Sequence, residues 1–255
     1  MSSYGLWLST AGMKVNDLRQ TILANNLANA NTTGFKHDLA VVMQRRVESK
    51  ESAGGAALAH PVLDGMAGGI EVRPTHYSRE QGAIEWTGRP LDLAIRGEGF
   101  FTVSDSESTR YTRNGEFAVN AVGELVLANE AGRWQLLDST GLPIRVDPAG
   151  DKLSVSPDGT VRQGRATIGT IGLSANEDPN GMRKVGENLF EAKRGTMRPA
   201  SGTLVPESRE MSTYDVVQGL ASMIEASRSY QLNATLLQLQ DDLTGQAVTT
   251  LGRVA

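Results

Sequence analysis

The chain has 255 residues, which is enough for one large domain or two small domains with a buried core. Its formal net charge is -4 and its isoelectric point is near 5.5, which argues against nucleic acid or anionic lipid as a partner. Cysteine is absent, so disulfides, thiolate nucleophiles and cysteine-ligated metals are excluded. The 28 glycines favour many turns, and the 5% aromatic content predicts a core of aliphatic residues.

The N-terminus has neither the basic start nor the continuous apolar run of a cleavable signal peptide. No stretch is long and apolar enough to suggest a membrane span. If the protein leaves the cytoplasm, we expect another export route.

A long helix is predicted from about Ser3 to Thr33, where Thr33-Gly34 provides a stop and Phe35 a hydrophobic follower. One stripe of residues recurs in steps of three and four: Leu8, Ala11, Val15, Leu18, Ile22, Asn25 and Asn29. The helix contains only three charged residues. Its outer face is therefore unusually neutral.

Four asparagines lie among the seven residues from Asn25 to Asn31, which also include Asn26 and Leu27. Asparagine is a mediocre helix former, so this run would weaken an isolated helix. One interpretation is that the asparagines only fray the helix end. The preferred hypothesis is that buried amides fix the register between helices, because Asn25 and Asn29 continue the stripe.

A second long helix is predicted from Thr213, with Ser212 or Thr213 as its cap and Asp215 near its positive end. The same stepping relates Val216, Leu220, Met223, Ser227, Tyr230, Ala234 and Leu237. A second apolar row contains Leu232, Leu236, Leu239 and Leu243. Between Val216 and Gln240 the only charged residues are Glu225 and Arg228.

The middle of the chain has the alternation and turn residues of short strands. Asn114-Gly115 between two such segments predicts a two-residue hairpin. The expected fold class is α+β: terminal helices from 1–36 and 212–255 pack together in a coiled-coil-like manner, and an all-β domain at 73–199 is inserted between them. Residues 37–72 and 200–211 are expected to form extended connectors, and the stretch Val47 to Gly69 is rich in Gly, Ala and Ser.

Enzyme motifs are missing from the sequence: there is no nucleophile elbow, Walker loop, zinc-protease motif or EF-hand loop. The three histidines, His37, His60 and His76, do not have metal-ligand spacing. No catalytic residue, metal or cofactor is predicted. An enzyme would need a constellation of residues that sequence motifs do not reveal.

Weakly charged helices suit burial on more than one side, because interface cores exclude charge. We therefore predict that the terminal helices pack against other subunits. The predicted subunit-packing residues are Leu8, Ala11, Val15, Leu18, Ile22, Asn25, Asn26, Leu27, Asn29, Phe35, Val216, Leu220, Met223, Ile224, Tyr230, Ala234 and Leu237.

Three separated segments resemble bacterial flagellar basal-body rod and hook proteins. They are Ala24 to Lys36, Pro90 to Phe101 (followed by Tyr111 to Gly115 and Phe117), and Met223 to Ala226 with Arg228 and Tyr230. The resemblance extends over nearly the whole chain in the same order. The pair Tyr214-Asp215 departs from the family pattern, in which Asn-Val is common. The departure leaves open whether the chain resembles a proximal or a distal rod protein, but it does not affect the resemblance to the family.

The resemblance implies a structural subunit of the flagellar rod, the periplasmic drive shaft between motor and hook. It implies passage through the flagellar type III export apparatus without a cleaved signal, and helical stacking on copies of itself and on other rod and hook proteins. It also implies that the terminal helices line the inside of the stack. The alternative is an adhesin-like or carbohydrate-binding β domain on a helical stalk, with Trp86, Trp134 and Tyr111 as a sugar platform.

Overall fold

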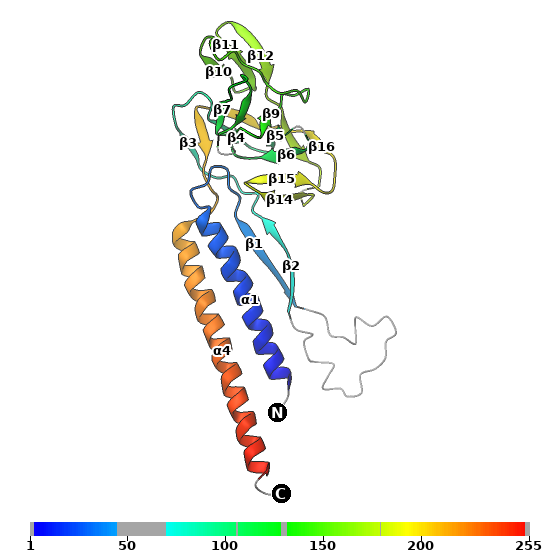
Figure 1. The fold of residues 1–255 in the computed structure, drawn as a ribbon, viewed down its shortest axis with the longest axis vertical. Coiled ribbons are helices and arrows are strands. Elements are labelled where there is room, and N and C mark those ends of the chain that lie inside the picture. The colour runs from blue at the N-terminus through cyan, green and yellow to red at the C-terminus, as the bar shows by residue number, and fades with distance from the viewer. Residues whose placement is uncertain (1–2, 45–69, 106, 129–131, 179, 253–255) are drawn as a thin grey trace, which may run out of the picture. The chain divides into compact units, whose positions relative to one another are not determined.

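The computed structural model describes residues 3–44, 70–105, 107–128, 132–178 and 180–252. The chain forms two compact units (Figure 1). The helical unit comprises Met1–Ala28, Asp38–His76 and Asp215–Ala255, and the β unit comprises Asn29–His37 and Tyr77–Tyr214. The chain thus alternates between the units. The predicted single inserted β domain is wrong in this respect, because Asn29–His37 belongs to the β unit and Asp38–His76 to the helical unit.

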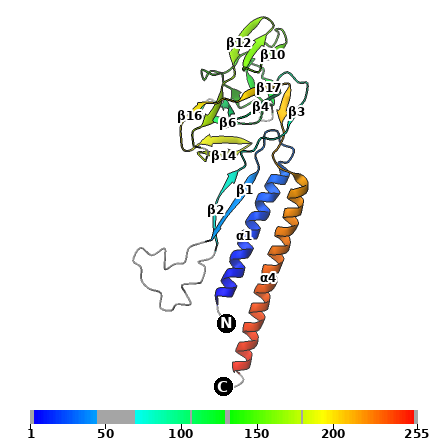
Figure 2. The same ribbon diagram turned by 180° about the vertical axis from the view of Figure 1, so that it is seen from behind.

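The described residues of the helical unit form two long antiparallel helices and a two-stranded sheet. Helices α1 (Ser3–Ala28) and α4 (Val216–Gly252) lie side by side in both views (Figures 1 and 2). Strands β1 (Asp38–Gln44) and β2 (Ile70–Tyr77) pair with each other. The described parts of the predicted connector 37–72 therefore include strand residues, whereas the stretch at 47–69 lies outside the described residues.

The ends of both helices differ from the prediction. Helix α1 ends at Ala28 rather than near Thr33, because the chain turns where the Thr32 backbone N–H donates to the Asn29 carbonyl at 3.1 Å. Helix α4 is capped by Asp215, whose carboxylate accepts hydrogen bonds from the backbone N–H groups of Val217 (2.8 Å) and Gln218 (3.1 Å).

Helices α1 and α4 meet through small and amide side chains. A Cβ atom added to Gly5 would lie 3.0 Å from Gln240 Nε2, and one added to Gly12 would lie 2.8 Å from Asn233 Oδ1. Ala226, seven residues before Asn233, is also buried. The predicted coiled-coil-like packing is wrong, because glycines set against amide side chains, and not two facing rows of leucine, form these contacts.

The β unit is built from short antiparallel strands. The described residues of its largest sheet follow the order β14-β15-β6-β5-β9-β8-β7, and β13 joins β5 to β16. These strands are β5 (Phe100–Ser104), β6 (Thr109–Thr112), β7 (Phe117–Val119), β8 (Leu125–Leu127), β9 (Gln135–Leu136), β13 (Leu173–Asn176), β14 (Met182–Gly186), β15 (Leu189–Ala192) and β16 (Met197–Pro199). Fully buried Phe101, Val103 and Leu136 belong to its hydrophobic core, which is mainly aliphatic but also contains Phe117 and Trp134.

Three smaller sheets are also formed by the described part of this unit. Their orders are β10-β11-β12, β17-β4 and β18-β3. The strands are β3 (Ile84–Trp86), β4 (Leu93–Arg96), β10 (Leu153–Val155), β11 (Thr160–Gln163), β12 (Ala166–Thr170), β17 (Thr203–Pro206) and β18 (Ser208–Glu210).

The hairpin predicted at Asn114-Gly115 is wrong. Strand β6 pairs with β5 and β15, whereas β7 pairs with β8. A Cβ atom added to Gly115 would lie 1.6 Å from the Leu93 carbonyl oxygen. The glycine is required by this close approach of two backbones rather than by a two-residue turn.

Candidate assembly surfaces

The predicted packing residues of the N-terminal segment fall into several environments. Val15, Ile22, Asn26 and Phe35 are buried, Ala11, Leu18, Leu27 and Asn29 are partly buried, and Leu8 and Asn25 are exposed. Asn29 and Phe35 lie in the β unit and not on α1. The stripe predicted as one continuous face is therefore divided among different surroundings.

Asn26 carries the buried amide of the asparagine-rich run. It is 1% exposed; its Nδ2 donates to the Asp38 carbonyl at 2.9 Å, and its Oδ1 accepts from the Asp38 N–H at 2.8 Å. The amide thereby fixes α1 against the start of β1. The hypothesis of a register-fixing amide was centred on Asn25 and Asn29 and on contacts between helices, whereas this contact joins a helix to a strand.

Helix α4 presents a long row of exposed apolar side chains. Of the predicted residues, Val216, Leu220 and Ile224 are exposed, and Met223, Tyr230, Ala234 and Leu237 are partly buried. We define the α4 apolar face as the exposed residues Val217, Leu220, Ile224, Leu232, Leu236, Leu239 and Leu243. Of these, Leu220 and Ile224 were predicted packing residues. The last four form the second apolar row of the sequence but were not predicted to pack, and Val217 lies outside both rows.

The α4 apolar face contains a single charged position. Its residues follow one another at steps of three or four, except that Arg228 occupies the place between Ile224 and Leu232. Leu232 is 66% exposed. An exposed apolar face of this length is typical of a protein–protein interface, because leaving it in water is unfavourable.

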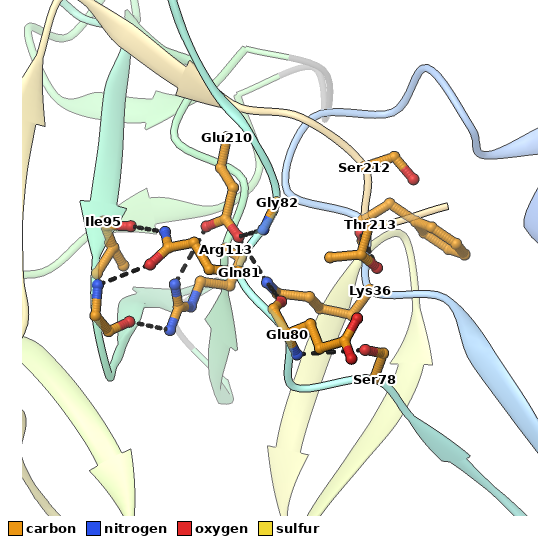
Figure 3. Close-up of polar contacts among 12 residues, drawn as sticks. Lys36, Ser78, Glu80, Gln81, Gly82, Ile95, Arg113, Glu210, Ser212 and Thr213 are labelled. Carbon is orange, nitrogen blue, oxygen red and sulfur yellow. Dashed lines mark hydrogen bonds and ion pairs between the residues drawn. The ribbon is translucent and has the colours of Figure 1, made fainter. Parts of the chain in front are cut away.

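The β unit contains a buried ion cluster (Figure 3). Lys36 Nζ lies 2.6 Å from Glu210 Oε1, and Arg113 Nη1 lies 3.2 Å from Glu210 Oε2. Glu210 is 0% exposed and also accepts the Gly82 N–H at 3.0 Å. Burial lowers the pKa of Lys36, and the charge of Glu210 opposes this shift.

This cluster joins the segment that follows α1 to the strand that precedes α4. Gly34 N–H donates to the Glu210 carbonyl at 2.7 Å, and Thr213 N–H donates to the Phe35 carbonyl at 3.0 Å. Sequence reasoning missed it, because Lys36 and Glu210 are separated by 174 positions and share no local pattern.

A cavity of 620 Å³ lies within the β unit, and its lining includes Lys36, Tyr77, Phe100, Arg113 and Met182. Burial raises the pKa of Tyr77. Among the described residues, no group of three or more His, Asp or Glu side chains could hold a metal ion.

The proposed aromatic sugar platform is not formed. Trp134 is 4% exposed and packs in the core, whereas Trp86 is 73% exposed. A stacking platform needs accessible ring faces. Within the described residues, no helix is long and apolar enough to cross a membrane.

Three family models match the chain in order. The model described as "Flagella basal body rod protein" matches residues 9–36, and "Flagellar hook protein FlgE/F/G D1 domain" matches residues 94–163. "Flagellar basal body rod FlgEFG protein C-terminal" matches residues 207–250. The first and third matches include most of α1 and α4.

Curated relatives are similar along nearly their whole length. The flagellar basal-body rod protein FlgF of Caulobacter vibrioides is 34% identical over 235 residues, covering 91% of each chain. FlgG of Buchnera aphidicola subsp. Baizongia pistaciae is 30% identical, covering 93% of this chain and 96% of the relative. FlgG of Bacillus subtilis is 29% identical, and the match covers 95% of this chain and 97% of the relative.

Proposed function

The chain belongs to the flagellar basal-body rod protein family, and on this basis we propose that it assembles through the α4 apolar face. It is a structural subunit of the flagellar basal-body rod and not an enzyme. Membership of the rod and hook family suggests assembly with other proteins of that family. Surfaces that bind other subunits are therefore its functional sites.

The observation that carries the proposal is the exposure of the α4 apolar face. Leu232, Leu236 and Leu239 are exposed, although α1 lies alongside the same helix. Burying apolar surface contributes about 25 cal/mol per Å², so covering seven such side chains with a neighbour favours association. Leu220 and Ile224 of this face were predicted as packing residues, and the exposed Leu8 of α1 joins the same interface.

The assembly that we propose is an open helical array of copies of this chain and other rod and hook proteins. Head-to-tail contacts that do not close into a ring generate such an array. A stiff stack of this kind forms the rod in the periplasm, and the rod transmits motor torque to the hook. Delivery through the flagellar type III export apparatus completes the proposal.

The test replaces leucines of the face in the flagellated source cell. Cells that produce the chain with Leu232→Gln and Leu239→Gln are expected to lose swimming and to lack complete rods in electron micrographs of basal bodies. The matched control is Leu142→Gln, which changes an exposed leucine of the β unit and should leave both unchanged. Normal rods in the double variant would contradict the proposal.

A further inference from the structure

Each terminal helix carries one charge of a sign that occurs nowhere else on that helix. Asp17 is the only acidic residue of α1, and Arg228 is the only basic residue of α4. Both side chains are exposed, and neither forms an ion pair with any other described residue.

The contact between the helices places these two charges at the same level. Gly12 lies against Asn233. Asp17 is five residues after Gly12, and Arg228 is five residues before Asn233. Because the helices are antiparallel, these steps lead in the same direction along the pair.

The two charges nevertheless lie on opposite faces of the pair. Five residues of an α-helix correspond to about 140° of rotation beyond one full turn. Seen along the pair, both rotations have the same sense, but they start from two positions that face each other. Asp17 therefore points to one side of the helix pair and Arg228 to the other side. The ion pair cannot form within one chain, but it can form between two chains placed side by side.

The surroundings of the two charges fit such a neighbour. Arg228 interrupts the α4 apolar face, so covering that face removes water from its guanidinium group, which is unfavourable without a carboxylate partner. Around Asp17, the exposed residues Thr10, Thr21 and Ala24 are small, and the long side chain there is that of Lys14. Large leucines of a neighbouring α4 can pack on them.

We propose that Arg228 of one copy pairs with Asp17 on α1 of a second copy, and that this pair sets the lateral register between subunits. The inference rests on the proposed assembly and names its charged contact. Because each copy offers Asp17 on one side and Arg228 on the other, the contact repeats without closing between two chains.

Charge reversal of the full-length chain tests the pair, with self-association measured by sedimentation velocity. Asp17→Arg and Arg228→Asp alone are each expected to weaken association about tenfold or more, and the two together on one chain are expected to restore it. Asp242→Arg and Arg165→Asp, at exposed positions away from the proposed contact, are matched controls with the same charge changes and should have smaller effects. Circular dichroism verifies that each variant keeps its helices.

A second measurement uses the absence of cysteine in the chain. A short bis-maleimide should crosslink a mixture of Asp17→Cys and Arg228→Cys chains into dimers, but neither variant alone. If the unmodified chain associates and neither rescue nor this crosslink is seen, the pairing is wrong and the proposed assembly stands. If the unmodified chain does not associate at all, both fall.

Discussion

Lys36 carries a buried charge whose main partner is Glu210, and this pair should dominate the polar stability of the β unit. The side chains are 3% and 0% exposed. Lys36→Met leaves the carboxylate with one cation fewer, and we expect the free energy of unfolding to fall by about 3–5 kcal/mol. Urea denaturation followed by tryptophan fluorescence measures this change.

The control for this substitution is Arg198→Met, which removes an exposed pair with Glu98 at 3.2 Å. Exposed pairs contribute about 0–1 kcal/mol, so this variant should remain close to the unmodified protein. Equal effects of the two substitutions would show that burial of the Lys36–Glu210 pair has no special role.

Asp105 provides a pH-dependent contribution. Desolvation raises the pKa of this carboxyl, but hydrogen bonds from Ser108 and Arg133 outweigh it and lower the pKa from 3.8 to about 2. Since the folded pKa lies below the unfolded one, the stabilisation is present above pH 3.8 and is lost as the pH falls through about 2. A carboxyl ¹³C NMR titration should give a midpoint near 2, and a midpoint near 3.8 would contradict the hydrogen-bonded geometry.

At the scale of the elements, two glycines of the helices should respond oppositely to the same substitution. A side chain at Gly12 meets Asn233 at 2.8 Å, whereas Gly245 has no described atom within 4 Å. Gly245→Leu should raise the stability of α4 by about 0.5–1 kcal/mol through helix propensity. Gly12→Leu should lower stability by about 1–3 kcal/mol, because it forces the helices apart.

Thermal melting followed by the helical circular dichroism signal compares these two variants. If both substitutions raised the melting temperature, close approach of α1 and α4 at Gly12 could not be what holds the pair together.

The sequence predicted that both helices exist, but not which faces they use. Stepping by three and four selects leucines and valines, whereas the contact uses Gly5, Gly12, Asn233 and Gln240, which carry no apolar signal. The exposed leucines of α4 form the surface that we propose other subunits cover. The β strands were recognisable from alternation, but their pairing was not, since the partners of β5 include β13, which is far along the chain.

At the scale of the whole molecule, family membership was predictable because its three motifs are local in sequence. The buried cluster of Lys36, Arg113 and Glu210 was not, because its members come together only in the fold. Family membership and the exposed face of α4 lead to the same account: a rod subunit whose helices pack against other subunits.

The most direct test of this account is the accessibility of Leu239 before and after assembly. Since the chain has no cysteine, Leu239→Cys introduces a unique thiol, and Val122→Cys places a control thiol at an exposed position of the β unit. The account predicts that a maleimide labels both thiols in the monomer, but only the thiol at position 122 in assembled rods. Equal labelling of position 239 in monomer and rod would contradict it.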